Sequence, residues 1–204
     1  MKRTLCISSS LDVGGAETLM MKIFKKLPKD YKIDFVTSKD NGFYEKEVIE
    51  LGGKIYRIPL RTKHPLTSFM ELKKIVKNNK YKSVLKLCDT SIGSIDLLAA
   101  KLGGASKLCV RSCNANSTSS KIRKVLHFIC RPFLNFISDV KIAPSELAAN
   151  YTFGKRCVEK GKVNFLHNAV DLDYYKFCNE DRKKIRKEFN IDEDTIFLRT
   201  YWEI

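Results

Sequence analysis

Short apolar runs with the composition of β-strands alternate along this chain with segments that have the period of amphipathic helices. A strand that is followed by a helix and then by another strand usually pairs in parallel through a right-handed crossover. The sequence therefore predicts the α/β class, with a Rossmann-like parallel sheet and helices on both faces. The expected strands are 3–8, 31–37, 54–58, 81–87, 107–112, 140–143 and 163–166, and the expected helices are 16–27, 43–51, 65–78, 92–102 and 146–153.

The length of the chain limits this fold to one core. With 204 residues, of which 44% are hydrophobic, there is no room for two full-sized α/β domains. We expect one domain over residues 1–166, followed over 167–204 by a hinge, a basic helix near 182–189 and a strand that lacks its domain. No apolar run reaches the ~18 residues of a membrane span, and the first residues lead into a strand rather than a signal peptide. The expected location is the cytoplasm, with peripheral contact to the inner face of the membrane left open.

The use of cysteine and histidine argues against a metal site. The 7 cysteines form no Cys-x-x-Cys pair, and an odd number of cysteines in a reducing compartment indicates free thiols. The 3 histidines do not stand at ligand spacing from a cysteine pair. We therefore expect no metal and no cofactor.

The charge of the chain is strongly positive. A net charge of +15, from 38 Lys and Arg against 23 Asp and Glu, favours a polyanionic partner or surface. The sequence contains no helix-turn-helix, finger or stacking motif, so nucleic acid is not the expected partner. Anionic lipids or phosphate-bearing substrates fit the charge equally well. The alternative is that the lysines only solvate the helix faces.

The break between the first strand and the first helix falls at Gly14 and Gly15. Glycines let the backbone approach a ligand closely, and the free N–H groups of a first helical turn favour a phosphate. A Gly pair after a strand is also common as a simple tight turn. From the residues alone, the pair is either an anion site or a turn.

Ligands of parallel sheets bind at the carboxyl ends of the strands, so the loops there are the places to search for a site. Residues 86–90 end the fourth strand, and residues 111–116 end the fifth. Arg111 can form paired hydrogen bonds with a phosphate or a carboxylate, and Asn114 can present a donor and an acceptor to a sugar hydroxyl. The alternative is that Arg111 pairs with a loop carboxylate and that Asn114 and Asn116 serve local turns.

Residues 121–138 form a basic amphipathic segment. Four apolar positions fall on one face, namely Ile122, Val125, Leu126 and Ile129. Another face carries Lys124, His127 and Arg131. Such a helix can lie in an anionic membrane interface and admit a lipid-linked acceptor, with contacts from Lys121, Lys124 and Arg131. The alternative is an ordinary helix that packs its apolar stripe on the sheet and keeps its cations in water.

Several motifs follow one another in the order found in family 4 glycosyltransferases of bacterial polysaccharide biosynthesis. They are Gly-Gly-Ala-Glu at 14–17, Leu-Gly-Gly-Lys at 51–54, Ala-Pro-Ser at 143–145 and Leu-His-Asn-Ala-Val-Asp at 166–171. The chain resembles the N-terminal, acceptor-side half of these enzymes from residue 5 to about 197. The resemblance implies a GT-B fold and a sugar transferred, with retention, from a nucleotide-sugar to a polysaccharide or lipid-linked acceptor.

The resemblance also implies roles for individual residues. Gly14 and Gly15 would meet the donor diphosphate. The acceptor contacts would come from Lys86, Cys88, Asp89, Arg111 and Asn114. Many relatives carry histidines in the loops after the fourth and fifth strands, whereas this chain has Lys86, Cys88, Arg111 and Cys113 there. We interpret these replacements as changed acceptor contacts, and they leave the proton transfer at the acceptor hydroxyl unassigned.

The family resemblance ends before the second, donor-binding domain, where the catalytic glutamates of the family are expected. The chain is therefore predicted to be inactive alone. The alternative is a non-catalytic acceptor-binding subunit of a split glycosyltransferase. A separate hypothesis concerns residues 199–204, which can be encoded by bases that read Gly-His-Ile-Gly-Arg in the neighbouring frame. A similar motif opens the donor domain in the family, so we expect a frameshift near Leu198, with coincidental codon choice as the alternative.

Overall fold

The computed structural model describes residues 2–114, 120–169, 172, 175–196 and 198. The chain forms two compact units, Met1–Asn168 and Ala169–Ile204. Residues 199–204, on which the frameshift hypothesis rests, lie outside the described part, as do Ala115 and Asn116 of the predicted loop.

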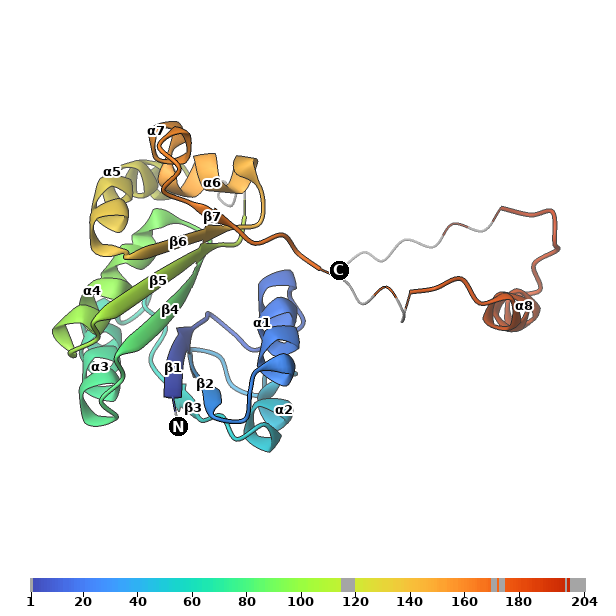
Figure 1. The fold of residues 1–204 in the computed structure, drawn as a ribbon, viewed down its shortest axis with the longest axis horizontal. Helices are drawn as coiled ribbons and strands as arrows, with labels where there is room; N and C mark the ends of the chain where they lie inside the picture. The colour runs from blue at the N-terminus through green and yellow to red at the C-terminus, as the bar shows by residue number, and fades with distance from the viewer. Residues whose placement is uncertain (1, 115–119, 170–171, 173–174, 197, 199–204) are drawn as a thin grey trace. The chain divides into compact units, whose positions relative to one another are not determined.

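The first unit contains a seven-stranded parallel sheet, and this confirms the predicted Rossmann-like fold (Figure 1). The strand order is β3-β2-β1-β4-β5-β6-β7, with the first strand inside the sheet between β2 and β4, as successive right-handed crossovers produce. The strands are β1 (Lys2–Ile7), β2 (Tyr31–Thr37), β3 (Ile55–Arg57), β4 (Ser83–Cys88), β5 (Lys107–Ser112), β6 (Val140–Ala143) and β7 (Asn164–Phe165).

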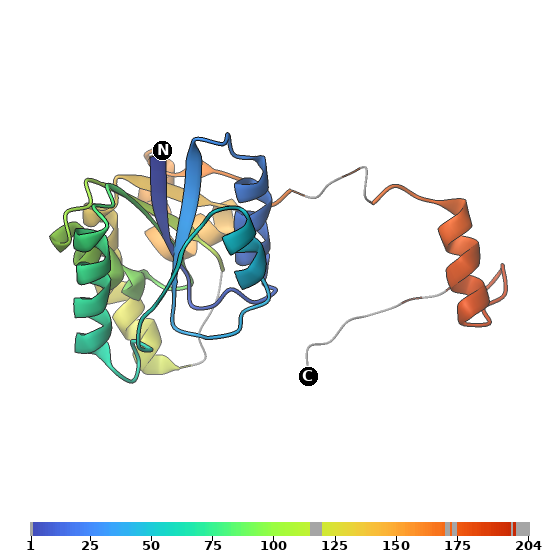
Figure 2. The same ribbon diagram turned by 90° about the horizontal axis from the view of Figure 1, so that it is seen from below.

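Helices cover both faces of this sheet, as predicted. In Figures 1 and 2, α1 and α2 lie on one side of the sheet and α3 and α4 on the other. The helices of the first unit are α1 (Gly15–Lys26), α2 (Glu45–Glu50), α3 (Pro65–Asn78), α4 (Ser94–Leu102), α5 (Lys121–Ile137), α6 (Glu146–Phe153) and α7 (Lys155–Glu159), with a 3₁₀ turn, η1 (Ser91–Gly93), before α4.

The sheet divides the core into two clusters of buried side chains. Leu5 and Ile7 belong to the cluster under α3, α4, α5 and α6, whereas Cys6 between them belongs to the cluster under α1 and α2. This alternation follows from the period of two along a strand. Because β1 lies inside the sheet and is covered on both faces, its buried half, Leu5–Ile7, is a continuous apolar run, whereas Lys2, Arg3 and Thr4 before it are polar.

Some predicted boundaries were wrong for local reasons. The helix expected over 43–51 is only Glu45–Glu50, because the Glu45 carboxylate accepts the N–H of Gly42 and closes a turn before the helix. The helix expected over 92–102 is divided into η1 and α4. Gly154, which directly follows the helix expected over 146–153, has a φ of +88° and joins α6 directly to α7.

The second unit contains one described helix, α8 (Asn179–Glu188), in the region where a basic helix was expected. The helix starts earlier than residue 182. Glu180 and Asp181 lie in its first turn, where the positive end of the helix dipole favours carboxylates. Arg182 forms an ion pair with Glu193, and Arg186 donates to the carbonyl of Thr195 at 2.8 Å. These contacts tie the residues after α8 to the helix itself.

Candidate functional site

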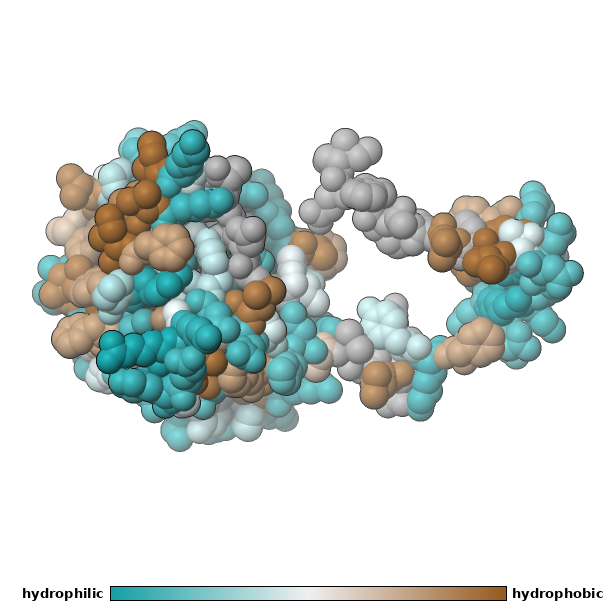
Figure 3. Space-filling model, turned by 90° about the horizontal axis from the view of Figure 1, so that it is seen from above, coloured by the Kyte–Doolittle hydropathy of each residue, from teal (hydrophilic) through white to brown (hydrophobic). Residues whose placement is uncertain are grey.

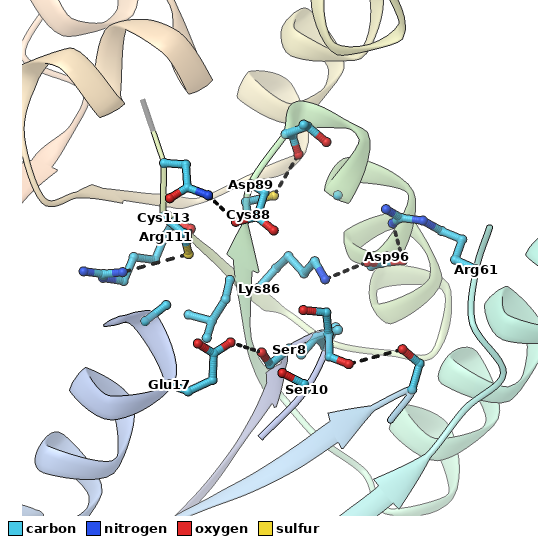
Figure 4. Close-up of a pocket in the computed structure, with 18 of the residues that line it drawn as sticks. Ser8, Ser10, Glu17, Arg61, Lys86, Cys88, Asp89, Asp96, Arg111 and Cys113 are labelled. Atoms are coloured by element: carbon cyan, nitrogen blue, oxygen red, sulfur yellow. Dashed lines mark hydrogen bonds and ion pairs between the residues drawn. The ribbon is translucent and has the colours of Figure 1, made fainter. Parts of the chain in front are cut away.

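A cavity of about 540 Å³ opens where β1, β4 and β5 end (Figure 4). This is the edge of a parallel sheet at which ligands are expected. Six of the predicted site residues line it, namely Gly15, Lys86, Cys88, Asp89, Arg111 and Asn114. Gly14 does not line it. The lining also includes residues that sequence reasoning missed, among them Ser8, Glu17, Arg61, Asp96, Arg123 and Asn168.

One wall of the cavity carries a charge cluster around the buried carboxylate of Asp96. Lys86, at the end of β4, places its Nζ 3.0 Å from Oδ2 of Asp96, and Arg61 places Nη1 2.8 Å from Oδ1 of the same carboxylate. Burial opposes the charged form of Lys86, but the Asp96 carboxylate outweighs it and holds the pKa of Lys86 above its usual value. Burial also opposes the charge on Asp96, yet the two cations hold its pKa below the usual value. The cluster therefore stays ionised and keeps one positive charge in excess.

The opposite wall carries Arg111, at the end of β5 (Figure 4). Only 2% of this residue is exposed. Its Nη2 donates to Oδ1 of Asn168 at 2.7 Å, and its Nη1 lies 3.9 Å from Sγ of Cys113. The alternative in which Arg111 pairs with a loop carboxylate is wrong within the described residues, since its partner is a neutral amide. Asn114 does make a local contact, because its Nδ2 donates to Asp89 at 3.2 Å.

The glycine turn is already close to a carboxylate. Gly14 is the N-cap of α1, in an extended conformation, and a Cβ there would lie 2.5 Å from Oε2 of Glu17. The hydroxyl of Ser8 donates to Oε1 of Glu17 at 2.7 Å. Gly14 therefore makes room for Glu17, while Gly15 lines the cavity and has open space where a Cβ would stand. A phosphate at this turn would approach through Gly15.

The two thiols near the cavity are not acid-base substitutes for histidine. Burial raises the pKa of Cys88 to about 12 and that of Cys113 to about 11. Cys88 is 1% exposed, and its Sγ donates to the carbonyl of Thr90 at 3.2 Å. A Cβ on Gly93 would lie 2.3 Å from this sulfur. Cys88 thus fills the floor of the cleft and remains a neutral thiol.

Helix α5 turns its apolar stripe outward, the reverse of the ordinary packing that was the alternative. Ile122 is 73% exposed and Phe136 is 82% exposed, with further exposed side chains at Val125, Leu126, Phe128 and Ile129. In Figure 3 these apolar side chains gather over α5, at the left of the molecule. Lys121 and Lys124 are exposed beside them, as the predicted membrane contact requires.

On the inward side of α5, the polar His127 lies beside the buried apolar side chains of Leu134 and Ile137, and Arg131 also makes contacts within the domain. Its Nη2 donates to the carbonyl of Tyr151 at 2.8 Å, and its guanidinium lies over the ring of Phe128. His127 is fully buried between α6 and η1. Arg131 is therefore engaged inside the domain, whereas Lys121 and Lys124 are the cations that α5 presents beside its stripe.

The described residues contain neither a membrane-spanning helix nor a cluster of metal ligands. No helix among them is both long and apolar enough to cross a membrane. In the same residues, no cluster of histidine, cysteine and carboxylate side chains could hold a metal ion.

Comparison with known proteins agrees with this fold. The sequence model of Glycosyltransferase Family 4 matches residues 13–174. EpsF of Bacillus subtilis (strain 168), described provisionally as a glycosyltransferase, is 30% identical over 183 residues, which cover 85% of this chain and 47% of EpsF. The chain thus spans about half the length of this curated relative.

Solved structures show the same fold. Anabaena HepE, in complex with UDP-glucose, matches with a TM-score of 0.67 and 15% identity over 93% of this chain and 50% of HepE. A glycosyltransferase from Rickettsia africae ESF-5 matches with a TM-score of 0.67 and 16% identity over 95% of this chain and 50% of that protein. In both cases the similarity covers half of the longer protein.

Proposed function

The chain belongs to glycosyltransferase family 4, and from that premise we propose that it supplies the acceptor side of an enzyme that transfers a sugar, with retention, from a nucleotide-sugar to a polysaccharide or lipid-linked acceptor. The observation that carries this proposal is the polar cleft at the ends of β1, β4 and β5, in a domain half as long as its relatives. Each related protein has a second half that could close over such a cleft.

We assign the donor diphosphate to the turn at Gly15, where backbone N–H groups and an open approach favour an anion. Gly14 supports this turn from outside the cavity. The acceptor contacts are assigned to Lys86, Asp89, Arg111 and Asn114, with Cys88 as part of the wall. The crystal structure of HepE with UDP-glucose supports a nucleotide-sugar as the donor class.

Peripheral membrane contact is the second part of the proposal. The apolar stripe of α5 and the adjacent Lys121 and Lys124 have the composition of a helix that lies in an anionic interface. The mouth of the cleft is lined in part by Arg123 of the same helix. A lipid-linked acceptor held in the membrane could therefore reach the cleft from the cytoplasmic side.

The chain alone is expected to be inactive, because leaving-group stabilisation and orientation need both sides of a closed cleft. The experiment uses a chimaera in which this chain replaces the first half of EpsF and is joined to the second half. The transfer of labelled sugar from UDP-sugars to bacterial membranes is then measured. We expect transfer by the chimaera and none by the 204-residue chain, with the anomeric configuration of the product determined by NMR.

Turnover by the chain alone would contradict its role as one half of a transferase. An inverted product would contradict retention. Binding of acceptor by the chain, without transfer in the chimaera, would favour a non-catalytic acceptor-binding subunit.

A further inference from the structure

The cations that line the cleft are not equally compensated. Lys86 and Arg61 both pair with the carboxylate of Asp96, so each has a counter-charge within the wall although the cluster as a whole keeps one positive charge in excess. Arg111 lies on the other side of the cleft, as Figure 4 shows, and forms no ion pair with any described residue. A buried charge without a counter-charge is costly, so it usually serves to bind an opposite charge from outside.

The surroundings of Arg111 offer hydrogen-bond donors. Its Nε is buried without a hydrogen-bond partner in the structure. The side-chain oxygen of Asn168 accepts from Arg111, and the Nδ2 N–H groups of Asn168 can donate to a ligand in the cleft. An arrangement of donors around a buried guanidinium fits an oxyanion.

A second cation faces the same space. Arg123 lies in the first turns of α5, is exposed and lines the cavity together with Arg111 and Asn168. It takes part in no ion pair among the residues that the structure describes. Its neighbour Lys124 is also exposed but does not line the cavity. The two adjacent cations therefore lie on different sides of the helix.

We propose that Arg111, Asn168 and Arg123 form a phosphate-binding subsite in the cleft. Guanidinium groups bind phosphate oxygens with paired, charge-assisted hydrogen bonds, and Asn168 holds Arg111 in place for them. The subsite deepens the proposed function, on which its biological role rests. The phosphate belongs either to the diphosphate of the donor or to a phosphate that links the acceptor to its lipid.

Calorimetric titration of the full chain with inorganic pyrophosphate tests the subsite. We expect saturable binding that is weakened at least about tenfold by Arg111→Gln, the loss typical of a charge-assisted contact. Arg123→Gln is expected to weaken it about threefold, because the exposed cation is screened by solvent. Lys124→Gln, the matched control on the next residue of the helix, should leave the affinity unchanged.

Asn168→Asp tests the same idea without removing the cation. A carboxylate at this position gives Arg111 a counter-charge at the existing 2.7 Å contact, so the thermal midpoint should rise or stay constant while pyrophosphate binding is lost. This variant decides the matter if Arg111→Gln does not fold. Equal binding by the wild type and Asn168→Asp, or no binding of pyrophosphate at millimolar concentration, would overturn the subsite.

The source of the phosphate follows from two further probes, UDP and farnesyl diphosphate in detergent. Tighter, Arg111-dependent binding of UDP assigns the subsite to the donor, and tighter binding of the lipid diphosphate assigns it to the acceptor.

Transfer by the EpsF chimaera with no effect of Arg111→Gln or Asn168→Asp would refute the subsite alone. Pyrophosphate binding as expected, with an inactive chimaera, would refute the proposed function and leave the subsite standing.

Discussion

The backbone N–H of Ser91 donates a 2.9 Å hydrogen bond to Nδ1 of His127, which joins the turn beside the cleft to the inward face of α5. Because Nδ1 accepts, the neutral ring carries its proton on Nε2, which donates to the carbonyl of Tyr151 at 3.0 Å. The ring also stacks on that of Tyr151, with 4.4 Å between the centroids. One side chain therefore holds η1, α5 and α6 together.

Replacing His127 with alanine should lower the free energy of unfolding by about 2–4 kcal/mol, because it leaves a cavity and an unsatisfied N–H on Ser91. Urea unfolding at pH 7.5 measures this loss. His127→Asn keeps an acceptor near the position of Nδ1 and should recover part of the stability. Unchanged stability in the alanine variant would show that the contact with Ser91 is dispensable.

The same histidine makes stability depend on pH. Burial, and then the nearby Arg131, hold the pKa of His127 below its usual value of about 6.5. The folded state thus favours the neutral ring, and the stabilisation is complete above about pH 6.5 and is lost as the pH falls through the lowered pKa. Unfolding curves between pH 7.5 and 5 should show this fall in the wild type and a smaller one in His127→Asn. Parallel curves for the two proteins would contradict it.

Gly15→Ala separates ligand binding from folding. The added methyl group meets open space and replaces a glycine at the start of a helix, so stability should stay equal or rise by about 0.4–1 kcal/mol. The methyl group would nevertheless stand in the cleft, where we assign the donor diphosphate. In the EpsF chimaera we expect a higher KM for the nucleotide-sugar with a thermal midpoint that is unchanged or slightly raised.

Gly53 is the matched control for Gly15, because an added methyl group at Gly53 has no space. A Cβ on Gly53 would lie 2.5 Å from the carbonyl oxygen of Ile33, so Gly53→Ala should destabilise the fold. An unchanged KM in Gly15→Ala would remove the donor role of the turn.

The apolar stripe of α5 can be removed without harm to the core. Val125→Ser combined with Ile129→Ser should abolish flotation with phosphatidylglycerol vesicles and leave the thermal midpoint unchanged, because both side chains are exposed. Leu134→Ala, on the buried side of the same helix, should cost about 2–5 kcal/mol. Vesicle binding should also fall with added salt, since Lys121 and Lys124 act at the surface. Binding that survives the double substitution would exclude the stripe as the contact.

Asp96→Asn removes the counter-charge that the largely buried Lys86 shares with the partly exposed Arg61. Breaking a buried pair in this way costs about 3–5 kcal/mol, which urea unfolding at neutral pH detects. Since the pKa of Asp96 is held below its usual value, its contribution is present above about pH 4 and disappears as the pH falls through the lowered pKa. Asp40→Asn, in an exposed pair with Arg57, is the control and should have little effect.

The sequence predicted the strands and the edge of the sheet that carries the cleft, because both follow from local apolar periods. It did not predict the partners within the cleft. Asp96 reads as an ordinary acid in the first turn of a helix, and its pairing with Arg61, 35 positions earlier, depends on the path of the chain. Asn168 was seen only as part of a hinge motif, although it binds Arg111, 57 positions away.

Helix α5 shows a different limit of sequence reasoning. The helical period correctly separates the stripe that contains Ile122 and Ile129 from the face that contains His127 and Arg131. It cannot say which face points inward. Here the carbonyl of Tyr151 and the N–H of Ser91 satisfy the polar face, so the apolar face is the one left in solvent.

Asn168, which holds Arg111 in place, is also the last residue of the first compact unit. The point at which the chain leaves this domain is therefore fastened to a cation in the cleft by a single hydrogen bond. The position of this cleft-lining guanidinium is thus set by the same residue at which the domain ends, so a change of backbone direction at Asn168 would also change the geometry of the cleft.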